Sequence, residues 1–187
     1  MFRGIKFKKG QQPGYRATWV KDERSPHAEG HNGHVIGDWW PYRLCTMRDV
    51  VHGNLKNGIC GKPDHGAVSI LMGSENRYKD IDNGDVIEYC GDKTNLMDLG
   101  FETGKLIRVI RGAKDGSIFA PSVGFRYDGL YKIESKEKLP EKGYNRYKLV
   151  QDKNQKPIRM VHPTVDEMDE FIARNNWISS NKSKAKR

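Results

Sequence analysis

The sequence predicts a single domain of the α+β class in which β-strands dominate. Short apolar runs alternate with clusters of Gly, Pro, Asn, Lys and Asp, at the spacing of strands joined by turns. A chain of 187 residues is long enough for one hydrophobic core and too short for two ordinary domains. The strands are expected at 67–72, 86–90, 105–111, 129–135 and 144–150.

The clearest turn joins two of these strands. Asp82-Asn83-Gly84-Asp85 is a turn signal because Asn and Gly tolerate a positive φ, and Val86–Cys90 then forms the return strand. Upstream, residues 42–51 also have a strand-like pattern. A glycine-rich loop follows them and ends at the apolar run Ala67–Met72, which is predicted to be a buried strand.

One helix is predicted, at 164–176. Thr164 and Glu167 form a capping box after Pro163, and acidic residues in the first turns complement the helix dipole. Its apolar side chains fall on one helical face. Residues 1–33 are predicted to form a polar lead-in arm, and residues 179–187 a basic tail.

Composition limits the possible partners. There are 33 Lys and Arg against 24 Asp and Glu, a formal charge of +9, which weakly favours a polyanionic partner. No long apolar run suggests a membrane segment. The three cysteines are widely spaced, without a CxxC pair, so free thiols are expected, with no metal and no cofactor.

Four ordered blocks resemble one family. The segment Phe125–Ile133 contains Tyr127-Asp128-Gly129, and it follows Gly66–Leu71, Asp80–Asp85 and Glu88–Gly91 in order and at approximate spacing. Together they resemble the SRA domain, also called the YDG domain, whose members read modified cytosine in DNA. The resemblance implies a PUA-like twisted β-barrel with flanking helices at 34–178, and an architectural role for the Tyr-Asp-Gly element.

The resemblance also implies a pocket for a flipped base. Tyr89 and Tyr78 would stack on the base, and Asp80 would accept a hydrogen bond from the exocyclic amine of cytosine, which selects it over thymine. Cys90 stands where the family typically has threonine. The ligand would be 5-methylcytosine, and size tolerance could equally admit 5-hydroxymethylcytosine. The implied pocket consists of Gly58, Gly73, Ser74, Tyr78, Asp80, Tyr89 and Cys90.

The rest of the implied DNA interface consists of a groove loop and phosphate contacts. The loop is Leu55, Lys56 and Asn57, which would fill the space left by the flipped base. Many relatives carry a long major-groove insertion after the pocket strand, whereas only Gly91 to Glu102 stand here, so strict hemimethylated CpG preference is not expected. Phosphate contacts are expected from Lys93, Arg108, Arg111 and Arg126.

No catalytic function is predicted, because the sequence lacks RING cysteines and a SET module. The expected partner is double-stranded DNA containing modified cytosine, bound by a monomer in the nucleus as a chromatin reader. Two alternatives stay open. One is a degenerate SRA scaffold that binds DNA or protein without modification specificity. The other is a component of a modification-dependent nuclease, for which Asp64 and Glu134 superficially resemble a metal-binding pattern.

Overall fold

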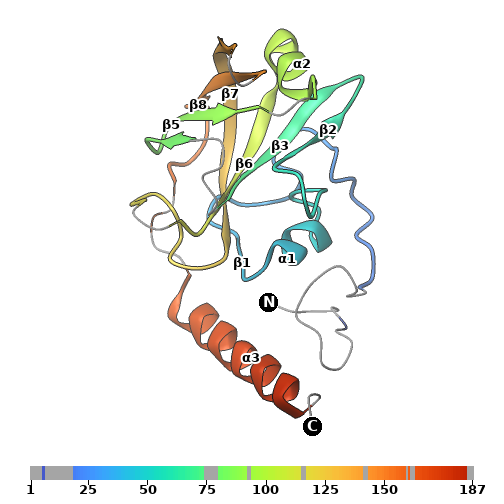
Figure 1. Ribbon diagram of the computed structural model, residues 1–187, viewed down its shortest axis with the longest axis vertical. Helices are drawn as coiled ribbons and strands as arrows, with labels where there is room; N and C mark the ends of the chain where they lie inside the picture. The colour runs from blue at the N-terminus through green and yellow to red at the C-terminus, as the bar shows by residue number, and fades with distance from the viewer. Residues whose placement is uncertain are drawn as a thin grey trace.

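The chain forms one strand-rich body from which its last helix projects (Figure 1). A computed structural model describes residues 6, 19–73, 80–91, 94–114, 117–140, 143–158, 160 and 163–184, with the side chains of 178–184 left out. The strands are β1 Trp39–Trp40, β2 Ile59–Lys62, β3 Gly66–Met72, β4 Ile81–Asp82, β5 Val86–Cys90, β6 Leu106–Gly112, β7 Phe125–Leu139 and β8 Tyr144–Gln151. The helices are α1 Arg43–Arg48, α2 Leu96–Thr103 and α3 Val165–Lys184.

The strands form one eight-stranded sheet in the order β2-β3-β6-β7-β8-β5-β4, with β1 beside β7. Strands β3 and β6 run parallel, and the segment between them contains the β4–β5 hairpin and α2. The other described pairs are antiparallel. Among the described strands, β2 and β4 end the order without pairing to each other, so the predicted barrel is an open sheet.

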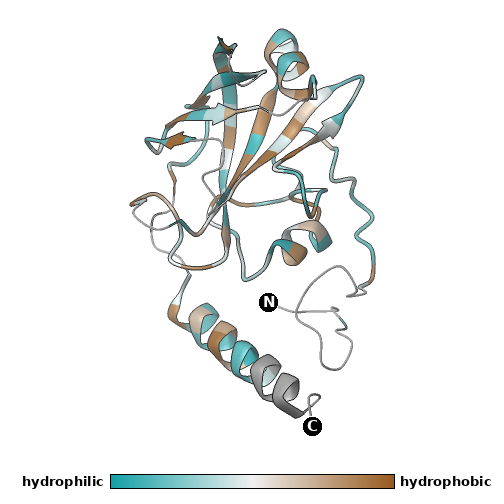
Figure 2. Ribbon diagram, viewed as in Figure 1, coloured by the Kyte–Doolittle hydropathy of each residue, from teal (hydrophilic) through white to brown (hydrophobic). Residues whose placement is uncertain are grey.

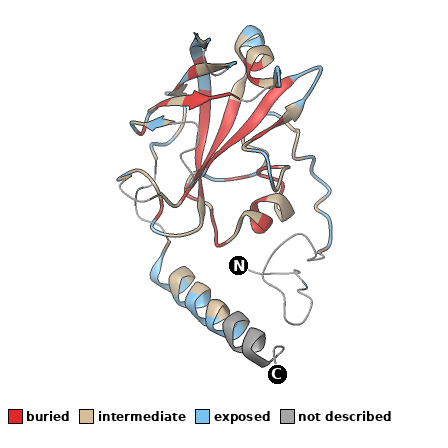
Figure 3. Cartoon of the chain, viewed as in Figure 1, coloured by how far each residue is buried: buried red, intermediate tan, exposed pale blue. Residues whose placement is uncertain are grey.

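The core consists of side chains from β2, β3, β5, β6, β7 and β8 together with α2, which packs against β2, β3 and β7. Hydrophobic residues predominate in the middle of the central strands, with polar residues among them (Figure 2), and the middle of the sheet is buried (Figure 3). From α2, Met97 is buried and Leu96 and Phe101 pack against the cluster. The cluster consists of Ile59, Ala67, Ile70, Met72, Ile87, Tyr89, Met97, Ile107, Val109, Tyr131, Ile133, Tyr147 and Leu149.

A second cluster joins α1 and β1 to the same sheet. Leu44 and Cys45 of α1 pack with Leu71, Ile110 and Tyr127 of the sheet. None of the described side chains of α3 is buried. Near this cluster, Phe171 of α3 lies with its ring centroid 6.2 Å from that of Trp39 and 5.8 Å from that of Tyr42. These ring contacts attach α3 to the body.

A buried ion network crosses the sheet behind the β4–β5 hairpin. Arg111 of β6 donates to both carboxylate oxygens of Asp82, at 2.9 and 3.0 Å, and to Asp128 of β7 at 2.6 Å. Arg126 donates to the same Asp128. Arg111 also donates to the carbonyl of Gly84, at 2.5 Å. The network therefore ties the hairpin turn to β6 and β7, and the buried Tyr-Asp-Gly element is architectural, as predicted.

A third buried arginine fixes residues 26–30 of the predicted lead-in arm. Arg108 of β6 donates to the carbonyls of Pro26, Ala28 and Gly30 at 2.5 to 2.7 Å, and to that of Val51 at 3.2 Å. Hydrogen bonds to backbone carbonyls offset part of the free-energy cost of burying the guanidinium group. Residues 26–30 therefore belong to the folded body, and the predicted arm extends too far along the chain.

The structure confirms most of the predicted elements. All five predicted strands are present, β7 being longer than expected, and Asn83 donates to Val86 at 2.9 Å in the predicted turn. Three predictions are corrected. Residues 43–48 form a helix rather than a strand, α2 has no counterpart in the prediction, and the last helix runs to Lys184. A six-residue segment is too short for its periodicity to separate the two structures.

We expect Asp128→Ala to lower the free energy of unfolding by about 3–5 kcal/mol, because it leaves Arg126 buried without a carboxylate and removes one of the two carboxylates that pair with Arg111. Urea unfolding measures this change. Glu134→Gln is the control, since its ion pair with Lys148 is about half exposed, and removing it should cost less than about 1 kcal/mol. A loss at Asp128 no larger than at Glu134 would contradict the central role of the network.

Candidate nucleic-acid interface

Asp80 lies at the start of the β4–β5 hairpin, directly before β4. Its carboxylate accepts a hydrogen bond from the backbone amide of Cys90 at 2.9 Å, which fixes it against the end of β5. Burial raises the pKa of Asp80, while the Cys90 amide, Lys114 and Arg146 act in the opposite direction. The site therefore holds a half-buried acceptor with a fixed orientation.

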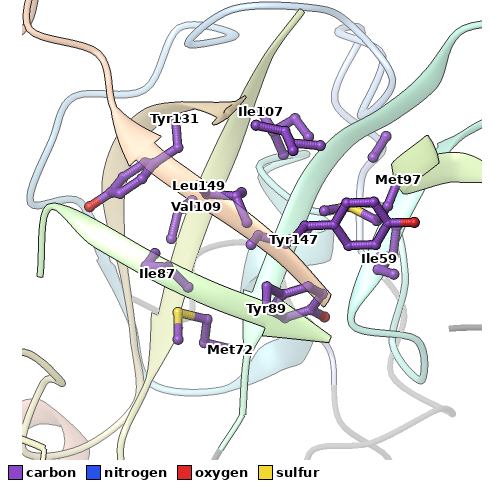
Figure 4. Close-up of a cluster of buried hydrophobic side chains, with 13 residues drawn as sticks. Ile59, Met72, Ile87, Tyr89, Met97, Ile107, Val109, Tyr131, Tyr147 and Leu149 are labelled. Carbon is purple, nitrogen blue, oxygen red and sulfur yellow. The ribbon is translucent and has the colours of Figure 1, made fainter. Parts of the chain in front are cut away.

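Tyr89 is the aromatic residue beside this acceptor. It stands on β5 opposite Tyr147 of β8, and both rings belong to the core cluster (Figure 4). Tyr89 is only 6% exposed. Stacking a base on Tyr89 would require its ring to be uncovered first.

Gly58 is where the backbone of the loop before β2 comes closest to Tyr89. A Cβ atom at Gly58 would lie 2.5 Å from the Tyr89 hydroxyl and 3.2 Å from the carbonyl oxygen of Leu71. No real Cβ approaches another heavy atom that closely, so a larger residue would push the loop and the tyrosine apart. The glycine lets the loop and the tyrosine touch.

The predicted groove loop has one inward and two outward residues. Leu55 packs against the cluster around α1, whereas Lys56 and Asn57 are exposed. The side chain of Asn54 accepts hydrogen bonds from the amides of Lys56 and Asn57 at 2.8 and 2.9 Å. The loop is therefore held in a defined turn, and Lys56 is better placed than Leu55 to contact a ligand.

The predicted pocket residues are only partly brought together. Gly58 lies beside Tyr89, and Asp80 beside Cys90, so two pairs of predicted residues meet on β5. Gly73 follows β3 and is exposed. Ser74 and Tyr78 lie outside the described residues, as does Lys93.

The predicted phosphate contacts include an error. Arg108, Arg111 and Arg126 are 0 to 1% exposed, and their guanidinium groups donate hydrogen bonds to carbonyls or carboxylates inside the protein. These three side chains are not available to phosphate in this structure, because their charges are needed to hold the fold together.

Arg146 is a candidate that the sequence interpretation missed. It lies on β8 directly opposite Cys90, and its side chain is 25% exposed. Its Nη1 lies 3.4 Å from a carboxylate oxygen of Glu88, and its Nε is buried without a partner. Only the pairing of β8 with β5, 58 residues apart at this contact, brings this arginine to the site.

Several negative findings concern the described residues. No group of three or more His, Cys, Asp or Glu among them is arranged to hold a metal ion. Within the same residues, no helix is long and apolar enough to cross a membrane. Cys45, Cys60 and Cys90 are buried free thiols, as predicted.

The SAD/SRA domain model matches residues 28–155, more than half of the chain. The chain belongs to the SAD/SRA domain family. A UHRF1-like protein of Cryptococcus neoformans is 33% identical over 140 residues, which cover 59% of this chain and 41% of that protein. The E3 ubiquitin-protein ligase UHRF1 of Rattus norvegicus is 29% identical over 149 residues, and the match covers 59% of this chain and 19% of that protein. The matched region thus spans less than half the length of these relatives.

Solved structures share the fold. The modification-dependent restriction endonuclease TagI superposes with a TM-score of 0.59 at 27% identity, covering 68% of this chain and 53% of that chain. The SRA domain of SUVH5, solved with methylated CHH DNA, superposes with a TM-score of 0.57 at 23% identity. The match covers 71% of this chain and 99% of that chain. At this identity the likeness to SUVH5 establishes the fold alone.

We expect Asp80→Asn to raise the free energy of unfolding at pH 7. A carboxyl group with a raised pKa in the folded state stabilises the fold at low pH, and this contribution is lost as the pH rises through that pKa. Asn keeps the oxygen that accepts from Cys90 and removes the buried charge. The gain should disappear as the pH falls toward the ordinary value of 3.8, and a variant less stable than the wild type at pH 7 would contradict it.

Proposed function

We propose that this chain is a reader of 5-methylcytosine in double-stranded DNA that holds the modified base, flipped out of the helix, beside Asp80 and Tyr89. The observation that carries the proposal is the half-buried Asp80 carboxylate, fixed by the Cys90 amide next to an aromatic residue. Family membership supports it. So do the SUVH5 SRA domains solved with methylated and with hydroxymethylated CG DNA.

The chemistry of the acceptor explains a choice of cytosine. Cytosine presents an N4 amino donor where thymine presents an O4 acceptor. A carboxylate whose orientation is fixed by a backbone amide would accept a hydrogen bond from the amine and repel the thymine oxygen. This part of the site would recognise the base, whereas the modification at C5 would be sensed by contact with the protein near Cys90.

Positive charge at the edge of the site supports DNA as the ligand. Arg146 and Lys114 both lower the pKa of Asp80, so both lie close enough for their charges to act on it. Lys56 is exposed on the loop beside Tyr89. With the three buried arginines excluded, these residues are the ones we propose for phosphate and groove contacts.

The proposed role is binding without catalysis. The ligase and endonuclease activities named for the relatives belong to proteins that this chain matches only in part. Asp64 is paired with His65 at 2.8 Å, and Glu134 with Lys148 at 3.0 Å, which gives the nuclease alternative no support among the described residues. Action as a monomer in the nucleus is part of the same proposal.

One observation favours a second candidate, an SRA scaffold without modification specificity. Tyr89 is 6% exposed and is packed with Tyr147 in the core, so the ring that should stack on a base is largely covered. If it stays covered, DNA binding would depend on charge alone. The two functions differ in their sensitivity to the C5 substituent.

Binding to matched duplexes that carry cytosine, 5-methylcytosine or 5-hydroxymethylcytosine tests the reader function at fixed physiological salt. We expect a preference of roughly threefold to tenfold for a modified duplex, since burying one methyl group contributes about 1 kcal/mol. Asp80→Ala should abolish the preference. Asp85→Ala is the matched control, an exposed aspartate on the same hairpin that should leave it intact. Equal binding of all duplexes would establish the scaffold instead.

We expect Arg146→Gln to weaken binding to modified and unmodified duplexes alike, and to reduce the slope of log affinity against log salt by about 1, because one phosphate contact is lost. Fluorescence anisotropy over a range of salt concentrations measures both effects. Lys153→Gln serves as the control, since Lys153 is exposed in the turn after β8. An unchanged salt slope in the Arg146 variant would exclude this contact.

A further inference from the structure

We propose that His52 is a positioning residue that holds the 54–58 loop against Tyr89, so that the loop can support a flipped base. The proposal rests on the proposed function, because it assigns the loop a part in DNA recognition. His52 lies outside the base pocket and is 0% exposed, so its role is to hold another group in place.

The hydrogen bonds of His52 define which of its ring nitrogens carries the proton. Its Nε2 lies 3.0 Å from the carbonyl oxygen of Asn57, and its Nδ1 lies 2.9 Å from the hydroxyl of Ser69 on β3. A carbonyl can only accept, so Nε2 carries the proton and Nδ1 accepts from the hydroxyl of Ser69. Burial lowers the pKa of His52 to about 4, so the ring is neutral at physiological pH. The ring thus connects a core strand to the loop.

Arg43 of α1 holds the same loop from the other side. It donates to the carbonyl of Asn54 at 3.3 Å and to that of Asn57 at 2.5 Å. The Asn57 carbonyl therefore accepts from both His52 and Arg43. A charged donor and a buried neutral donor on one oxygen fix the end of the loop from two elements.

The position of this carbonyl determines the contact with the site. Gly58 follows Asn57 directly, and its own carbonyl accepts from the amide of Leu71 at 2.7 Å. The space for a Cβ at Gly58 is already occupied by the Tyr89 hydroxyl, 2.5 Å away. A chain of contacts thus runs from Ser69 through His52 and Asn57 to Gly58 and Tyr89. A loop released from His52 would no longer keep Lys56 and Gly58 at a fixed distance from the pocket.

Two substitutions separate the hydrogen bonds of His52. In His52→Gln the amide nitrogen reaches the Nε2 position and still donates to Asn57. In His52→Asn the shorter side chain reaches only the Nδ1 position, so the contact with Ser69 is kept and the donor to Asn57 is lost. The two variants place similar polar groups in the same buried space, which makes each a control for the other.

The test measures affinity for 5-methylcytosine and unmodified duplexes, together with amide hydrogen exchange at residues 56–58 in the free protein. We expect His52→Asn to weaken binding of the modified duplex about fivefold, the effect of one lost hydrogen bond, with affinity for the unmodified duplex within about twofold of wild type. Exchange at 56–58 should quicken. His52→Gln should restore both properties. If His52→Asn fails to fold, Arg43→Gln, a change at a partly exposed residue, should show the weaker binding and faster exchange expected for His52→Asn.

The outcomes separate this proposal from the proposed function. Equal losses in the Asn and Gln variants, or an equal loss for both duplexes, would show a purely structural histidine and overturn the proposal. If the wild type does not prefer the modified duplex, the reader function fails. The exchange measurement then still decides the positioning role: faster exchange in the Asn variant alone supports it, and unchanged exchange overturns it.

Discussion

The ion network around Arg111 is the interaction on which the rest of the structure depends. Arg111 of β6 joins Asp82 of the edge hairpin to Asp128 of β7, and both carboxylates are almost fully buried. Desolvating such a cluster costs several kcal/mol, and this cost is offset because the charges pair and every guanidinium nitrogen of Arg111 has a hydrogen-bond partner. Asp82 lies two residues after Asp80 on an extended segment. The network that closes the core therefore also places the carboxylate of the candidate site.

The candidate site shares its residues with the core. Tyr89 and Cys90 belong to a core strand, and Gly58 touches Tyr89 through a contact that no other residue type would allow. A site built in this way is rigid, because its residues are held by packing as well as by hydrogen bonds. Opening it to a base would disturb the core. The raised pKa of Asp80 shows a similar conflict between function and stability. The buried charge that would recognise cytosine lowers the stability of the fold.

Local sequence patterns were sufficient for much of the fold, and the order of the family blocks pointed to residues of the candidate site. The strands β3, β5, β6 and β8 follow from apolar runs bounded by turn residues, and the start of α3 from its capping box. Asp80 and Tyr89 were found through the order of four family blocks, and both lie at the candidate site. By contrast, α1 is too short to show a helical period, and Arg146 reaches the site only through pairing between distant strands.

The sequence by itself determined the family, the strand-rich class and the β4–β5 hairpin on which the candidate site lies, because these depend on short-range patterns and ordered motifs. Only the tertiary structure decided what the arginines do. A lone arginine in a sequence is expected at the surface. Arg108, Arg111 and Arg126 are buried because their partners, which include residues from 2 to 82 positions away, converge on them after folding. The carbonyls and carboxylates that hold Arg108 and Arg111 lie 17 to 82 positions away and leave no local signal. Only the three-dimensional structure therefore separates a cation that is available to a ligand from a structural one.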